Sequence, residues 1–343
     1  MTTRARFHAV MNFEPFDHLP IVELAVWWDQ TIARWQSEGL PGRYDRSADR
    51  YEICRHFGLE NYTMCHFFGN RGPGCPAPAT HGGGIVASMD DYERVRPHLF
   101  PWPVVDHDYW ARWAEQQQAG DAVVSFAIFG YFWFPRELLG IQEHLYAFYD
   151  QPELMHRMNR DVAEYHLRIV DEVCRTCTPD FIMISEDMSY NHGPMLSEGL
   201  FDEFMKPYYQ RIVGLLQDRG ILVFIDSDGD ITEPWPWFEG AGLDGIWPLE
   251  RQAGVDVAVL RERHPRARFM GTFDKMTMSR GEAAMRAEFE RLLPVAAQGG
   301  LIVCCDHQTP PEVSYQDYQL YLSLFREYAP EAGRLSQSLL LAR

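Results

Sequence analysis

A strand–helix–strand pattern occupies residues 181–225, which read FIMISEDMSYNHGPMLSEGLFDEFMKPYYQRIVGLLQDRGILVFI. The short apolar runs at residues 181–184 and 221–225 are typical of buried strands. Between them, residues 196–219 carry apolar side chains at helical spacing, and Gly220 suits the end of a helix. Strands that are joined through a helix run parallel, so this stretch predicts one βαβ unit of an α/β fold.

The same alternation extends over the whole chain. It predicts eight strands, at residues 20–24, 62–67, 123–128, 181–184, 221–225, 245–249, 267–270 and 301–304. Eight parallel strands separated by helices are typical of a (β/α)8 TIM barrel, whereas an open doubly wound sheet would carry a glycine-rich fingerprint after its first strand. The glycine run at residues 82–84 follows no strand and opens no helix. We therefore predict a single-domain α/β barrel over residues 1–343, with an irregular Pro/Gly-rich excursion at about residues 70–90.

Composition restricts the class of protein and its partners. The chain has 343 residues, of which 46% are hydrophobic and 23% charged, as in ordinary globular proteins. It has 31 Lys and Arg against 49 Asp and Glu, a net charge of −18, which disfavours nucleic acid and anionic membranes as partners. The seven cysteines are scattered, and no membrane span or signal peptide is apparent, so we expect a cytoplasmic location. The composition is compatible with a monomer and with a homo-oligomer.

Acidic residues follow five of the predicted strands. These residues are Glu186 and Asp187, Asp226 and Asp228, Glu250, Asp274, and Asp306 with His307. The active site of a parallel barrel lies at the carboxyl ends of its strands, so these side chains are expected to share one mouth. Each alone could cap a helix, but several carboxylates together repel one another unless a cation, shared protons or basic neighbours compensate them. Lys275 is the basic residue near them in sequence.

This pattern favours a divalent metal or a cationic substrate. We predict Asp228, Glu250 and His307 as metal ligands, because such a mixed oxygen and nitrogen set suits zinc with an open coordination position. Magnesium and manganese also accept oxygen ligands and remain alternatives. A metal-free acidic pocket that protonates or binds the substrate is the competing interpretation. Glu186, Asp187 and Asp226 are the predicted catalytic residues.

Aromatic residues are dense where loops should reach the mouth. Consecutive aromatic side chains point in different directions, so some of those at residues 27–28 and 130–134 should line a pocket for a flat or apolar ligand. Arg136 follows directly and could anchor an anionic group of the substrate. The predicted substrate-binding residues are Trp27, Trp28, Tyr131, Trp133, Arg136 and Asp274.

Six segments of the chain resemble the uroporphyrinogen decarboxylase-like superfamily, in the same order. They lie at residues 5–41 (ARFHAVMNFEPFDHLPIVELAVWWDQTIARWQSEGLP), 185–198 (SEDMSYNHGPMLSE), 224–230 (FIDSDGD), 245–256 (GIWPLERQAGVD), 271–275 (GTFDK) and 299–318 (GGLIVCCDHQTPPEVSYQDY). The resemblance implies a (β/α)8 barrel. It also implies one of two activities, that of the true decarboxylases or that of the zinc methyltransferases that act with methyl-corrinoid proteins.

Departures from the family patterns favour the methyltransferase side. The decarboxylases carry an Arg-Gln-Ala-Gly-Arg motif after the first strand, where this chain reads ELAVWW at residues 23–28. In the methyltransferases a His-x-Cys-Gly turn and a late cysteine bind zinc. The corresponding segments here look like Asp226–Gly229 and Cys304–His307. The resemblance therefore implies a harder, oxygen-rich metal site suited to a Lewis-acid role.

The sequence predicts a methyltransferase. It would move a methyl group, with the help of the metal, from a small methylated substrate, for example a methoxy-aromatic compound, to a corrinoid on a separate partner protein. A decarboxylase or related lyase acting on a small carboxylated substrate, with Asp226 or Asp228 as proton donor, is the alternative within the superfamily. A barrel that binds a small molecule without catalysis is the alternative from another class.

Overall fold

The computed structural model describes residues 1–42, 44, 50–67 and 71–341. The chain divides into two compact units. Unit 1 comprises residues 1–62, 116–123 and 246–343, and unit 2 comprises residues 63–115 and 124–245. The division falls inside four secondary-structure elements, and each of these is assigned below to the unit that holds most of it.

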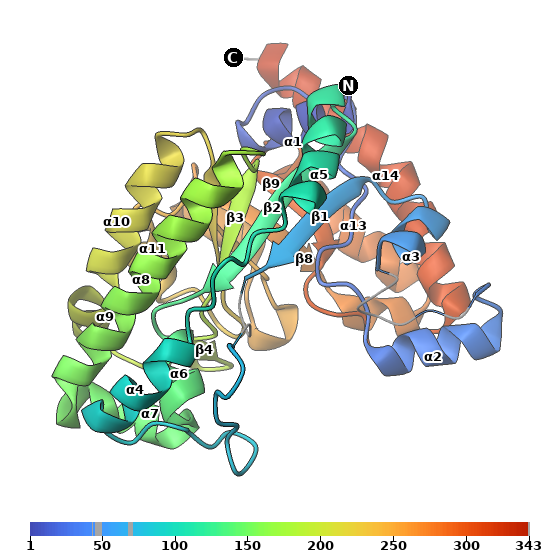
Figure 1. The fold of residues 1–343 in the computed structure, drawn as a ribbon. Coiled ribbons are helices and arrows are strands. Elements are labelled where there is room, and N and C mark those ends of the chain that lie inside the picture. The colour runs from blue at the N-terminus through green and yellow to red at the C-terminus, as the bar shows by residue number, and fades with distance from the viewer. Residues whose placement is uncertain (43, 45–49, 68–70, 342–343) are drawn as a thin grey trace. The chain divides into compact units, whose positions relative to one another are not determined.

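Unit 2 contains a parallel sheet. Its strands, in the spatial order β1-β2-β3-β6, are β1 (Asn61–His66), β2 (Ala122–Phe129), β3 (Phe181–Ser185) and β6 (Leu222–Asp226), with β1, β2 and β3 visible side by side in Figure 1. Ser125 pairs with Phe181, and Ser185 pairs with Asp226, in parallel register. Because β3 and β6 end opposite each other, the segments that follow them begin at the same edge of the sheet.

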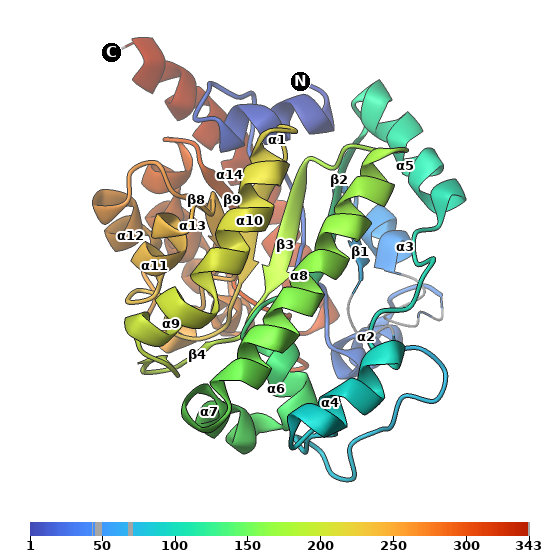
Figure 2. The ribbon, with the colours of Figure 1, turned by 60° about the vertical axis from the view of Figure 1, so that its left-hand side comes forward.

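Unit 2 also contains helices. They are α4 (Met89–Val95), η1 (Arg96–His98), α5 (His107–Ala119), α6 (Trp133–Leu139), α7 (Ile141–Asp150), α8 (Pro152–Cys174), α9 (Glu198–Phe204), α10 (Lys206–Gln217) and α11 (Trp235–Gly240). A short antiparallel pair, β4 (Ser189–Tyr190) and β5 (Gly193–Pro194), follows β3. Figure 2 shows α8 and α10 running side by side, and α10 packs on β6. The apolar side chains of both helices lie on the faces they bury, and for α10 this is the helical spacing predicted at residues 196–219.

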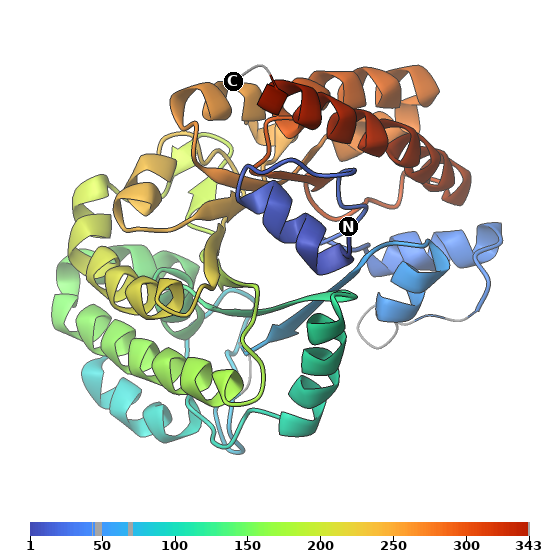
Figure 3. The ribbon, with the colours of Figure 1, turned by 90° about the horizontal axis from the view of Figure 1, so that it is seen from above.

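Unit 1 contains a second set of strands. They are β7 (Gly245–Trp247), β8 (Arg268–Phe273) and β9 (Leu301–Cys305), in that order, and β8 pairs with β9 in parallel. The helices of this unit are α1 (Thr3–Met11), α2 (Asp29–Glu38), α3 (Arg50–His56), η2 (Arg251–Ala253), α12 (Val257–Arg263), η3 (Lys275–Arg280), α13 (Glu282–Ala296) and α14 (Tyr315–Leu341). Helices α13 and α14 pack against each other, as Figure 3 shows.

The predicted α/β class is confirmed, with seven of the eight predicted strands present. The prediction of a strand at residues 20–24 is wrong, because this segment is irregular. An isolated β-bridge between Trp27 and Thr309 follows it in the chain. Pro20 has no N–H to donate to a ladder, and Val26 has a left-handed φ of 59°, which interrupts extended backbone. A full eight-stranded barrel is therefore not shown by the described residues.

Two further boundaries differ from the prediction. The helix predicted at residues 196–219 is divided into α9 and α10 at Met205, because Pro207 stands in the first turn of α10 and cannot continue a preceding helix. The excursion at about residues 70–90 is irregular as predicted, up to the start of α4. No described helix combines the length and the apolar character that crossing a membrane requires.

Candidate active site

The turns after β3 and β6 are tied together by hydrogen bonds. The Ser185 hydroxyl donates to Asp226 Oδ2 at 3.0 Å. The backbone N–H groups of Glu186 and Asp187 donate to the Asp226 carbonyl oxygen at 2.8 and 3.3 Å. These bonds fix the positions at which the three acidic residues leave the sheet.

The backbone around Asp187 and Asp228 is unusual. Asp187 has a left-handed φ of 44°, which aspartate tolerates better than most residues, and the Asp228 N–H lies 3.4 Å from Asp187 Oδ1. Gly229 has a φ of 85°, and a Cβ there would lie 2.7 Å from the backbone of Tyr190. This turn therefore requires glycine at position 229, and it holds the two carboxylates near each other.

Asp187, Asp226 and Asp228 form a compact carboxylate group in unit 2. One ligand oxygen of each lies within 4.8 Å of the others. Burial, followed by the charges of Asp187 and Asp228, raises the pKa of Asp226 well above its usual value. A divalent cation would relieve this repulsion, so the residues present could hold a metal ion. Their oxygen-only donor set suits magnesium and manganese as well as zinc.

Glu186 is completely buried, and its hydrogen-bond partners lie outside this group. Its carboxylate accepts hydrogen bonds from the backbone N–H groups of Tyr131, Phe132 and Trp133 at 2.7, 2.7 and 3.0 Å, and from the Tyr209 hydroxyl. Burial raises the pKa of Glu186 to about 8, against the effect of the three N–H groups. The side chain thus anchors the start of α6, and its predicted catalytic role remains a prediction.

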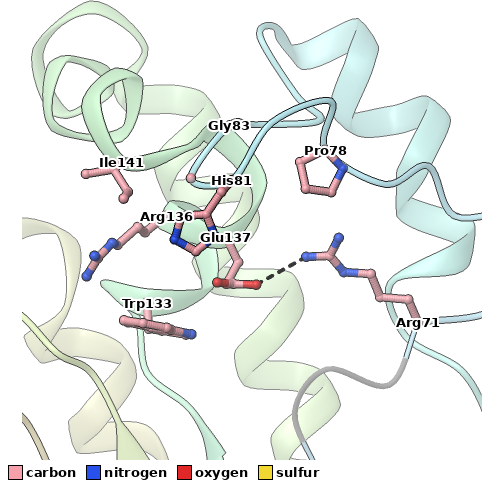
Figure 4. Close-up of a pocket in the computed structure, with 9 residues that line it drawn as sticks. Arg71, Pro78, His81, Gly83, Trp133, Arg136, Glu137 and Ile141 are labelled. Carbon is pink, nitrogen blue, oxygen red and sulfur yellow. Dashed lines mark ion pairs between the residues drawn. The ribbon is translucent and has the colours of Figure 1, made fainter.

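Helix α6 carries two predicted substrate-binding residues into a pocket of about 550 Å³ (Figure 4). Trp133 and Arg136 lie three residues apart, hence on one face of the helix, and the guanidinium carbon lies 4.7 Å from the Trp133 ring centroid. Arg136 Nη1 also donates to the Asp187 carbonyl oxygen at 3.3 Å. This bond connects the pocket to the segment that carries the carboxylate group.

The opposite wall of the pocket comes from the irregular excursion. Arg71, Pro78, His81, Gly82 and Gly83 line it. The glycine run 82–84 allows the excursion to approach the α6–α7 junction closely, since a Cβ on Gly84 would lie 2.2 Å from the carbonyl oxygen of Leu139. The N–H of Ile141 donates to the Gly82 carbonyl at 3.1 Å. No site residue was predicted in this excursion, although its glycine run signals a close backbone approach.

The other predicted aromatic residues lie elsewhere. Tyr131 is completely buried and packs on Tyr209. Trp27 is buried in an aromatic cluster of unit 1 with Trp35 and Tyr318, whereas Trp28 is 46% exposed. Of the four aromatic residues predicted to bind substrate, Trp133 is the one that lines the pocket.

Two of the predicted acidic residues of unit 1, Glu250 and Asp306, lie close to Lys275. Its Nζ lies 3.7 Å from Glu250 Oε1 and 3.3 Å from Asp306 Oδ1. Asp306 is fully buried and accepts the N–H of Arg251 at 3.0 Å. Asp274 accepts the N–H of Met276 at 2.9 Å, which caps η3, so its carboxylate already has a local structural partner.

The predicted ligand set is divided between the two units. Asp228 belongs to unit 2, while Glu250 and His307 belong to unit 1. Their joint ligation of a metal remains a prediction. Within unit 2, Asp187 and Asp226 are the described acidic neighbours of Asp228.

Comparisons with known proteins identify the family. A search of curated proteins finds no match. Among solved structures, the YdhT protein from Bacillus subtilis has 9% sequence identity and a TM-score of 0.46, with 94% of this chain and 87% of that chain covered. An L-ribulose 3-epimerase has 10% identity and a TM-score of 0.42, with 82% and 98% covered. The sequence profile of the family described as uroporphyrinogen decarboxylase (URO-D) matches residues 135–328, more than half of the chain. The chain therefore belongs to the URO-D family.

Proposed function

We propose that this protein is a metal-assisted methyltransferase that moves a methyl group from a small methylated substrate to a corrinoid on a partner protein. The observation that carries the proposal is the carboxylate group of Asp187, Asp226 and Asp228, whose ligand oxygens lie within 4.8 Å of one another. Three like charges at this separation are costly, and a divalent cation is the usual compensation.

The residues named in this proposal divide into three groups, and each group has its own task. Asp187, Asp226 and Asp228 would hold the ion, which when bound supplies a Lewis acid for the leaving heteroatom of the substrate. Trp133 and Arg136 would bind and orient the substrate. Glu186 acts through α6, because its bonds to the first N–H groups of that helix determine where Trp133 and Arg136 lie.

A decarboxylase is the second candidate, and the position of Asp226 beside two other carboxylates favours it. The pKa of Asp226 is raised well above its usual value, so this carboxyl is suited to holding a proton that it can deliver to a carbanion-like product. In that case the carboxylate group would act through a shared proton rather than through an ion.

Metal analysis and an acceptor assay separate the two candidates. We expect stoichiometric divalent metal in the purified protein, its loss in Asp228→Asn, and chelator-sensitive methylation of free cob(I)alamin by 2-methoxyphenol, followed by absorbance. Arg94→Met, on the exposed part of α4, serves as a control that keeps the metal. A metal-free protein whose turnover is insensitive to chelator and to added metal contradicts the methyltransferase proposal and favours carbon dioxide release instead.

A further inference from the structure

The pocket of unit 2 is cationic although the chain carries a net charge of −18. Its described lining contains the guanidinium groups of Arg71 and Arg136 and the imidazole of His81, against the carboxylate of Glu137. Arg71 Nη2 lies 3.5 Å from Glu137 Oε2, so these two charges compensate each other (Figure 4). Arg136 forms no ion pair with the described residues, and its charge remains available in the pocket.

The guanidinium of Arg136 is held in one orientation. It stacks on Trp133 at 4.7 Å and donates one hydrogen bond, to the Asp187 carbonyl oxygen. A guanidinium has five N–H donors in a fixed plane, so most of them are free of bonds to the described residues. A preoriented guanidinium with free donors is suited to bidentate recognition of a carboxylate.

The rest of the lining is apolar. Pro78, Ile141 and the ring of Trp133 face the same space, and a volume of about 550 Å³ lies in the range that small-molecule sites occupy. An ion without an apolar body would leave these surfaces against water. Charge and lining together therefore match a small ligand that combines one carboxylate with a flat or apolar body.

We propose that this pocket binds a small carboxylic acid with an apolar body, and that Arg136 forms the bidentate contact with its carboxylate. The hydrogen bond from Arg136 to the Asp187 carbonyl oxygen links this carboxylate-binding end of the pocket to the segment that carries the carboxylate group. The statement that this ligand is the substrate rests on the proposed function. The binding of the ligand to the pocket does not depend on that function.

Calorimetric titration of the full-length protein with benzoate and with its neutral isostere benzamide tests the proposal. We expect benzoate to bind in the millimolar range or tighter, and benzamide to bind at least about tenfold more weakly. Arg136→Met should weaken benzoate binding by about tenfold or more, and Arg136→Lys by less, because lysine keeps the charge but loses the fork. Arg94→Met is the matched control and should bind as the wild type does.

Several outcomes overturn the proposal: no benzoate binding at millimolar concentration, equal binding of benzamide, or unchanged binding in a folded Arg136→Met protein. If inorganic phosphate binds as tightly as benzoate, the proposal is also overturned, since the apolar lining would then not contribute to binding. Asp228→Asn should lose the metal and keep benzoate binding. Benzoate binding without any methyl transfer would contradict the proposed function and leave this inference standing.

Discussion

The carboxylate of Glu186 occupies the place that a side chain on Gly130 would need. A Cβ built on Gly130 would lie 2.0 Å from Glu186 Oε2, well inside van der Waals contact. Gly130 immediately precedes the three residues whose N–H groups Glu186 binds. The absence of a side chain at position 130 is therefore what allows a buried carboxylate to anchor α6.

Gly130→Ala should lower the free energy of unfolding by about 3 kcal/mol, because either Glu186 or the start of α6 must move. Urea unfolding measures the change. The matched control is Gly214→Ala on the exposed side of α10, where a Cβ meets nothing within 4 Å. That control should gain about 0.5–1 kcal/mol from helix propensity. Equal stability of Gly130→Ala and the wild type would show that Glu186 does not require this space.

Tyr209→Phe should lower the free energy of unfolding by about 1–3 kcal/mol, because one hydrogen bond to the buried Glu186 carboxyl is lost without a change of shape. Thermal unfolding measures the loss. Tyr149→Phe on α7 is the control, since Tyr149 is 72% exposed, and it should be neutral. A neutral Tyr209→Phe would mean that the hydroxyl contributes nothing to the anchor of α6.

Asp226→Asn should stabilise the metal-free protein by about 1 kcal/mol at pH 8, because it removes one of three mutually repelling carboxylates. A carboxyl whose pKa is raised on folding costs stability once the pH exceeds its unfolded value, so the advantage should shrink toward pH 4. Urea unfolding in chelator at both pH values measures it. The same variant should bind metal much more weakly. A variant less stable than the wild type at pH 8 would contradict the repulsion argument.

Glu23→Gln should flatten the pH dependence of stability. Glu23 is buried, and burial raises its pKa to about 8 against the effect of the backbone N–H groups of Cys305, Leu24 and Ala25. The stability associated with the protonated carboxyl is complete below the unfolded pKa of about 4.5 and is lost as the pH rises to about 8. Between pH 5 and pH 8 the variant should lose about 3.5 kcal/mol less stability than the wild type, while Glu186 and Asp226 keep their own contributions in both proteins. The exposed Glu14→Gln should keep the wild-type profile, and a Glu23→Gln profile that also matches it would contradict the prediction.

Some of the candidate site follows from local sequence alone. Asp226 comes at the end of an apolar strand and Glu186 just after another, so parallel pairing brings their segments to one edge of the sheet. Strand periodicity carries this information, because it depends on the spacing of residues close together in the chain. Trp133 and Arg136 were predicted in a loop, and it is helix α6 of the structure that places them on one face.

Other features depend on contacts between distant residues. The direction of Glu186 toward α6 depends on the space at Gly130, 56 positions earlier in the chain. The pocket wall depends on the approach of residues 82–84 to the α6–α7 junction. Residues 20–24 have the composition of a strand, yet the left-handed backbone at Val26 and the imino group of Pro20 keep them irregular.

The sequence by itself determined the α/β class, the order of the seven strands along the chain and the acidic residues that follow them, because these depend on local periodicity and on strand ends. The tertiary structure alone decided which acidic side chains lie close together within unit 2. It grouped Asp187 and Asp226 with Asp228 and turned Glu186 into a buried anchor. Side-chain direction after a strand depends on a turn conformation and on the space left by distant residues, and neither is encoded in the spacing of the acidic residues themselves.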